Sequence, residues 1–193
     1  MDEPVTTNEV LPSFFIDRDL VDEYCGSKGL DVYSLLQECV DFGISGFLDF
    51  LSKKGIHISI RGNNAKAILH GSGKVISEFE PRVSKGGPNS NQHEPLVYAT
   101  DDPDYAIFLG IIKLKDEGMA YVGYPGGKVE CYTNREFVNG ASSLGSGYVY
   151  ILNNKDFHED ALHNFSNPSS QVPLFAIPVG PADIHTSIFV KNN

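Results

Sequence analysis

Apolar residues in the first third of the chain recur at intervals of three and four positions, a spacing typical of helices that bury one face. One such helix is expected between Asp31, which can cap its start, and Gly43, which can end it. A second, shorter helix is expected between a capping Ser45 and a terminating Gly55. The pattern predicts a helical N-terminal segment, residues 1–60, that packs on the rest of the protein. The apolar face of the first helix consists of Val32, Leu35, Leu36, Cys39 and Val40.

The remainder of the chain, residues 61–193, is expected to form one α+β core in which strands dominate. Asp102 and Pro103 form a helix start signal, and that helix is expected to run to about Leu114, although the Ile-Phe-Leu and Ile-Ile runs in this stretch are also compatible with a strand. The turn sequence Pro125-Gly126-Gly127 predicts a hairpin, as in a mostly antiparallel sheet. The expected strands are residues 56–60, 67–70, 96–100, 120–124, 128–133, 147–152, 173–179 and 187–190.

Composition and charge limit the classes of partner. The chain has 193 residues and a formal net charge of −10, which argues against broad, sequence-blind binding to nucleic acid or to an anionic membrane. The three cysteines stand at unrelated spacings, so buried thiols are expected rather than a disulfide framework. No early stretch reads as a signal peptide, and no apolar run is long enough to span a bilayer. We therefore expect a cytoplasmic protein with no membrane partner.

The common catalytic and cofactor signatures are absent from the sequence. The chain has no complete Gly-x-Gly-x-x-Gly, no Walker A spacing and no Gly-x-Ser-x-Gly. His158 and His163 are five positions apart, whereas two zinc ligands on one helix face need a spacing of four. The six histidines form no cluster with a cysteine, so no metal is expected.

Three segments carry side chains that can bind a ligand. His70 and Gly71 end an apolar strand, where the imidazole can bond a ribose hydroxyl and the glycine backbone can hold a flat amide. Tyr98 ends another strand just before a helix start, which offers an aromatic face beside backbone N–H groups. A third segment, residues 163–166, can present a polar side chain to a cleft. Each segment also has a purely structural interpretation: a strand-end histidine, a core tyrosine and a connection between strands.

The order of these segments resembles the ADP-ribosyltransferase-like superfamily, which includes toxins, poly- and mono-ADP-ribosyl transferases and RNA 2′-phosphotransferases. The resemblance covers about residues 67–184 and is closest to small bacterial and phage members. It implies a split antiparallel β-sheet core. It is carried by His70-Gly71-Ser72, by Glu80-Pro81-Arg82, by Val97-Tyr98-Ala99-Thr100, by the Gly-Tyr-Val-Tyr strand that begins at Gly147, and by the later Pro173-Leu174.

The superfamily cleaves the N-glycosidic bond between nicotinamide and ribose in NAD, so the resemblance implies NAD as substrate. It implies that His70 bonds a ribose hydroxyl, that Gly71 holds the nicotinamide amide and that Tyr98 packs near the nicotinamide ring. Arg82, whose planar fork suits phosphate oxygens, would pair with the pyrophosphate; a surface arginine beside acidic residues is the alternative. The remaining residues expected to line the NAD site are Ser72, Ala99, Thr100 and Tyr105.

The chain departs from the superfamily pattern at one important position. Transferring members use a late glutamate to orient the ribose and to stabilise its developing positive charge. Here the corresponding residue is Asn164, which can bond a hydroxyl but carries no charge. Glu159 or Asp156 can take the place of that carboxylate in the expected site.

Three function hypotheses follow. The first is NAD-dependent ADP-ribosyl transfer, with a protein or nucleic acid as acceptor, or NAD glycohydrolysis. The second is cleavage of an N-glycosidic bond on a modified nucleotide or DNA base, for which Lys74, Arg82 and Lys85 offer a local basic patch. The third is a catalytically inactive module that binds a nucleotide or a protein, which Asn164 favours.

Overall fold

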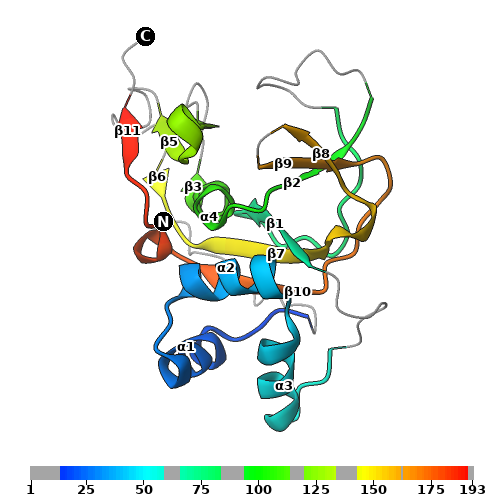
Figure 1. Ribbon diagram of the computed structural model, residues 1–193, viewed down its shortest axis with the longest axis vertical. Coiled ribbons are helices and arrows are strands. Elements are labelled where there is room, and N and C mark those ends of the chain that lie inside the picture. The colour runs from blue at the N-terminus through cyan, green and yellow to red at the C-terminus, as the bar shows by residue number, and fades with distance from the viewer. Residues whose placement is uncertain are drawn as a thin grey trace, which may run out of the picture.

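Three short helices form the N-terminal part of the protein. The structure is a computed structural model that describes residues 14–58, 66–83, 94–113, 120–133, 143–161 and 163–190. The helices are α1 (Arg18–Lys28), α2 (Val32–Phe42) and α3 (Ser45–Lys53). In Figure 1 they group at one end of the molecule, away from the smaller sheets.

The predicted limits of α2 are confirmed. Asp31 caps the helix by accepting a hydrogen bond from the N–H of Ser34, and Gly43 follows it with a φ of 90°. The predicted cap of α3 is wrong, because Ser45 is the first helical residue and the cap position is Ile44, which has no side-chain hydrogen bond. Ile44 is instead buried in the core, so packing rather than capping places this helix start.

The predicted strand at residues 56–60 is not present in its described part, residues 56–58. The Ile56 N–H bonds the Leu51 carbonyl, so the chain there completes the end of α3. Residues 59 and 60 lie outside the described residues.

The central sheet has the order β1-β7-β10 and is antiparallel throughout. Its strands are β1 (Ala67–Ser72), β7 (Gly147–Asn153) and β10 (Phe175–Val179), and all three were predicted. Alternation along the strands gives the sheet two apolar faces. One face packs against α1, α2, α3 and α4. The other face packs against Phe79, Phe157 and the strand β2 (Val97–Ala99).

Helix α4 (Pro103–Ile111) lies against β1 and β7 at very close range. A Cβ added at Gly71 would lie 1.8 Å from the carbonyl oxygen of Ala106, and one at Gly147 would lie 1.8 Å from that of Gly110. Only glycine allows this approach. The predicted start of α4 is confirmed, since Asp102 accepts from the Tyr105 N–H and Pro103 is the first helical residue.

The predicted end of α4 near Leu114 is wrong. The helix stops at Ile111, and the next residues form β3 (Ile112–Lys113), which pairs with β6 (Ser143–Leu144). Because α4 is buried on nearly every side, its apolar residues show no helical period that would mark its end.

Two further sheets flank α4, as Figure 1 shows. One has the order β11-β5-β4, with β4 (Ala120–Gly123) and β5 (Glu130–Thr133) joined through the short 3₁₀ turn η1 (Pro125–Gly127). This is the predicted hairpin, and β11 (Ile188–Val190) joins it in parallel. The other sheet has the order β2-β9-β8, with β8 (His158–Ala161) and β9 (Asn164–Asn167), which were not predicted as strands. The fold class is therefore α+β, as predicted.

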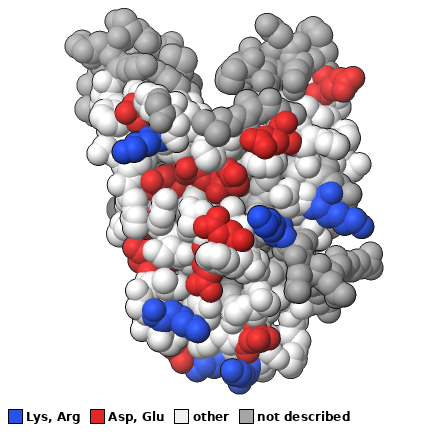
Figure 2. All heavy atoms as spheres, viewed as in Figure 1, with Lys and Arg blue, Asp and Glu red and all other residues white. Residues whose placement is uncertain are grey.

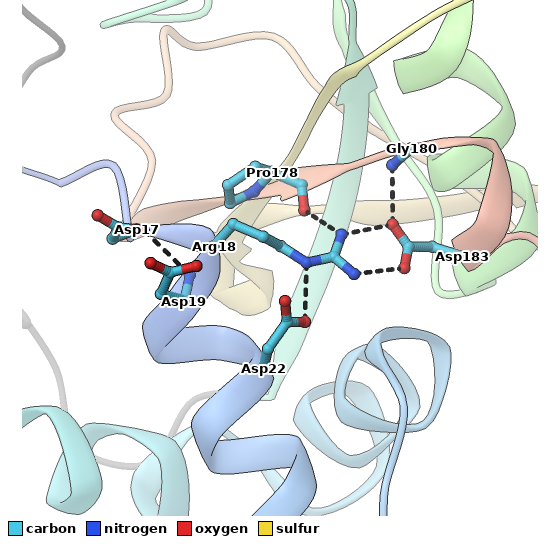
Figure 3. Close-up of polar contacts among 7 residues, drawn as sticks. All are labelled: Asp17, Arg18, Asp19, Asp22, Pro178, Gly180 and Asp183. Atoms are coloured by element: carbon cyan, nitrogen blue, oxygen red, sulfur yellow. Dashed lines mark hydrogen bonds and ion pairs between the residues drawn. The ribbon is translucent and has the colours of Figure 1, made fainter.

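A charged cluster ties α1 to the chain that leaves β10. Arg18 donates to both carboxylate oxygens of Asp183, at 2.7 and 2.9 Å, to the Pro178 carbonyl and to Asp22, as drawn in Figure 3. Asp183 also accepts from the Gly180 N–H at 2.8 Å. The bond to Asp183 holds the pKa of Arg18 above its ordinary value. The cluster fixes the N-terminal helix to the central sheet by side-chain contacts between residues 165 positions apart in sequence.

Candidate functional site

Strands β1 and β2 meet at one point and then separate. Leu69 and Thr100 exchange two backbone hydrogen bonds of 2.8 Å. Continued antiparallel pairing would place Gly71 opposite Tyr98, but no such pair forms, and the imidazole of His70 contacts the Tyr98 carbonyl oxygen instead. Further along β2, Leu96 pairs with Arg82. The part of β2 that is not paired with β1 therefore lies between the Leu69–Thr100 bridge and the Arg82–Leu96 bridge.

His70 is held in one orientation and one protonation state. Its Nδ1 lies 2.6 Å from the Tyr98 carbonyl oxygen, and because a carbonyl only accepts, Nδ1 carries the proton. Burial lowers the pKa of His70 most, the bond to the Tyr98 carbonyl raises it and the positive charge of Arg82 lowers it. The net pKa lies below its ordinary value, so the ring is mostly neutral near pH 7. The ring also packs on Phe79, with centroids 4.4 Å apart. Nε2 is therefore left as a lone-pair acceptor, and no described residue bonds it.

Gly71 presents its backbone polar groups at the edge of β1. In an antiparallel strand the N–H and C=O of alternate residues point to the same side, so those of Gly71 point where those of Leu69 point, toward β2. No described strand pairs with Gly71 on that side. We call the Nε2 of His70 together with these two backbone groups the His70–Gly71 edge. It offers two acceptors and one donor within two consecutive residues.

The structure brings together some of the predicted site residues. His70, Gly71 and Tyr98 are neighbours, although Tyr98 contacts the imidazole through its carbonyl and not through its phenol. Thr100 bonds the Leu69 backbone, and its hydroxyl accepts from the Asp102 N–H. Thr100 therefore links the end of β2 both to β1 and to the start of α4.

Other predicted binding residues have structural contacts or lie further away. Ala99 is buried in the core between the two sheets. The Ser72 hydroxyl accepts from the Lys74 N–H. Arg82 is exposed and pairs with Leu96 through its backbone, yet it is near enough for its charge to affect His70. Tyr105, in the first turn of α4, has its ring 6.1 Å from that of Tyr124, not beside His70.

The two candidates for the acidic position lie on opposite faces of their sheet. Glu159 pairs with Phe165, which pairs with Ala99, so these three share the face that packs toward the central sheet. Asn164 precedes Phe165 and therefore points to the other face. Glu159 is exposed, and two strand spacings, about 10 Å, separate it from Ala99. The side chain of Asp156, the third candidate, lies outside the described residues, as does Lys85.

Sequence reasoning missed a polar cluster at the start of α4. His163 donates from Nδ1 to the Asp101 carboxylate at 2.6 Å, and its ring lies 5.1 Å from that of Tyr124. Burial raises the pKa of both Asp102 and Tyr124. His163 and Asp101 are 62 positions apart, so no local sequence pattern predicts that they pair. The neighbouring acidic residues Asp101 and Asp102 are the part of the cluster that the sequence indicates.

Acidic residues dominate this part of the surface. Figure 2 shows acidic side chains gathered over the middle of the face on which α4 lies, with basic side chains scattered around them. Asp101 and Asp102 at the start of α4 are partly exposed, whereas Asp104 in its first turn is buried. This charge disfavours a long phosphate backbone as ligand, and Arg82 is a cation whose charge acts on His70.

The described residues contain no group of three or more histidine, cysteine or acidic side chains arranged to hold a metal ion. Cys25, Cys39 and Cys131 are buried free thiols, as predicted. Among the helices described, none has the length and apolar character needed to cross a bilayer. Comparisons of the chain with protein-family models, with curated proteins and with solved structures find no match.

Proposed function

We propose that this chain is an ADP-ribosyltransferase-like protein that binds NAD at the His70–Gly71 edge and cleaves its nicotinamide–ribose bond, with transfer to an acceptor or to water. The observation that carries the proposal is the fixed tautomer of His70. A neutral imidazole whose Nδ1–H donates to the Tyr98 carbonyl presents Nε2 as a hydrogen-bond acceptor only, and a ribose hydroxyl is a donor that suits it.

The chemistry of the edge matches the nicotinamide riboside half of NAD. A carboxamide has an N–H donor and a carbonyl acceptor side by side, and the Gly71 C=O and N–H are their complements. A ribose hydroxyl attached to the same ligand can donate to the adjacent His70 Nε2. Three hydrogen bonds to neighbouring residues would orient the scissile bond, which is the positioning that such a cleavage needs.

Cleavage also needs negative charge near the ribose as positive charge develops on it. Glu159 is the described carboxylate on the sheet face that packs toward the strand of His70. Loss of such a group typically lowers the rate by about 10²–10⁴. The proposal therefore assigns Glu159 the electrostatic role and gives Asn164, on the opposite face, at most a hydroxyl contact from the hairpin.

A second candidate function is NAD binding without turnover. It is favoured by the position of Glu159, which is exposed on the outer strand β8 and forms no ion pair or hydrogen bond with His70. The two candidates share the same binding edge and differ only in the chemical step.

Calorimetry with NAD and chromatography of released nicotinamide separate the two functions. We expect the wild-type chain to bind NAD, and His70→Ala to bind it about tenfold more weakly because one desolvated hydrogen bond is lost. His57→Ala is the matched control, because His57 is an exposed histidine whose ring bonds the Ser52 hydroxyl. Binding with nicotinamide release supports the enzyme, and binding alone supports the module. A wild-type chain that does not bind NAD contradicts both.

A further inference from the structure

A side-chain pair connects the turn between β8 and β9 to the start of α4. His163 and Asp101 are bonded at 2.6 Å, and their side chains are 26% and 35% exposed, so the pair is partly shielded from water. The His163 ring also packs on Tyr124, which precedes η1. The pair therefore joins the β8–β9 hairpin, α4 and the β4–β5 hairpin at a single point, which we call the His163 clasp.

The backbone conformation of His163 indicates that neighbouring contacts stabilise this residue in its place. His163 has a φ of 59° and is the non-glycine residue with a positive φ in the described part of the chain. A side chain in this left-handed region is uncommon, and such a conformation persists when the contacts around it stabilise it. Here those contacts are the bond to Asp101 and the packing on Tyr124.

The clasp is connected to the His70–Gly71 edge through few intervening residues. Asp101 directly follows Thr100, whose backbone bonds Leu69, the residue before His70. On the other side, Asn164 directly follows His163 and begins β9, which pairs with β2 over only three residue pairs. This short ladder, the packing of Phe165 on the apolar cluster and the clasp therefore all contribute to the position of the hairpin relative to His70.

We infer that His163 is a positioning residue that, through Asp101, holds the β8–β9 hairpin and its Glu159 in a fixed place relative to the His70–Gly71 edge. The expected effect on kcat rests on the proposed function, whereas the expected effect on the mobility of the hairpin does not. Without the clasp the hairpin remains folded but fluctuates, so Glu159 is less often in its place relative to the His70–Gly71 edge. The loss should thus appear in kcat more than in the affinity for NAD, because His70 and Gly71 lie on the other strand.

Two substitutions separate the backbone role of His163 from its side-chain role. His163→Asn tolerates the left-handed conformation and can donate to Asp101 through its amide, so it should retain most of the function. His163→Gly accepts the same backbone conformation without strain but removes both contacts. His158→Ala is the matched control, because His158 is exposed on the same hairpin and outside the clasp.

Amide hydrogen exchange measures the mechanical effect on the full-length chain. We expect His163→Gly to raise exchange in β8 and β9 about tenfold, the effect of losing one charge-assisted hydrogen bond, with β7 and β10 unchanged. His163→Asn and His158→Ala should stay near wild type. Equal exchange in His163→Gly and wild type would overturn the inference, whatever the chain does with NAD.

Nicotinamide release then tests the catalytic effect. We expect His163→Gly to lower kcat about tenfold with an unchanged dissociation constant for NAD, and His163→Asn to recover most of kcat. Raised exchange with unchanged kcat would also overturn the positioning role. If wild-type protein does not bind NAD, the proposed function fails alone, and the exchange measurement still decides whether the clasp holds the hairpin.

Discussion

The α1–α3 segment and the region around the start of α4 are held in place in different ways. The three helices share one apolar core with the central sheet, and Arg18 adds a bidentate bond to the buried Asp183. Around the start of α4, short sheets of two to four residue pairs are held by a smaller apolar cluster and by polar contacts such as His163–Asp101. Many apolar contacts hold the α1–α3 segment, whereas fewer contacts hold the short sheets. The contrast places most of the stability in the helical region, and the proposed NAD site lies in the other.

The core of the helical region gives the largest expected effect. Leu36 is fully buried in α2, so Leu36→Ala should lower the free energy of unfolding by about 2–5 kcal/mol through lost burial and a cavity. Urea denaturation measures the change. Phe42→Ala, at an 83% exposed position of the same helix, is the control and should change stability little. Equal effects of the two substitutions would contradict the assigned core.

The contact of α4 with β1 gives the next effect. Gly71→Ala places a Cβ 1.8 Å from the Ala106 carbonyl oxygen, so it should destabilise the fold by about 1–3 kcal/mol or more by overpacking. A thermal melt is the measurement. Gly180→Ala meets no atom within 4 Å and should leave the melting temperature nearly unchanged. A Gly71→Ala protein as stable as wild type would show that α4 sits further from the sheet.

The Arg18 cluster should give a smaller effect. Asp183→Asn removes the charge that Arg18 grips and should cost about 1–2 kcal/mol, since Asp183 is only 8% exposed. Asp22→Asn removes the exposed partner of the same arginine and should cost less than about 0.5 kcal/mol. Denaturation of both variants in one buffer tests the ranking, and a larger loss for Asp22→Asn would reverse it.

The smallest expected effect on stability is the pH dependence due to His70. Its folded pKa lies below the unfolded value of about 6.5, so the unfolded chain binds more protons in between. The stability that neutral His70 contributes is present above about pH 6.5 and is lost as the pH falls toward the folded pKa. His70→Gln should flatten this part of the stability curve between pH 7 and 5. An unaltered slope would mean that folding does not lower the pKa of His70.

Local patterns allowed the elements with a clear period or a start signal to be predicted from sequence. These include α2, the start of α4 and the strands of the central sheet. The β8–β9 hairpin was missed because His158-Glu159-Asp160-Ala161 shows no apolar alternation. It is held by pairing with β2 and by His163, and these are contacts between distant parts of the chain.

The candidate site was predictable in part for the same reason. His70, Gly71 and Tyr98 could be named from their motifs, but their relation could not, because it depends on where β1 and β2 separate. The contact that fixes the tautomer of His70 is made with a backbone carbonyl, so the identities of the side chains do not predict it. Gly71 has a second role, the close approach of α4, that only the packed structure reveals.

A structure of the chain in complex with NAD tests the central claim most directly. The account predicts a ribose hydroxyl within hydrogen-bonding distance of the His70 Nε2 and the nicotinamide amide on the backbone of Gly71, with the Nδ1 contact to Tyr98 retained. A dinucleotide bound elsewhere, or bound with the His70 ring turned away from Tyr98, would contradict it.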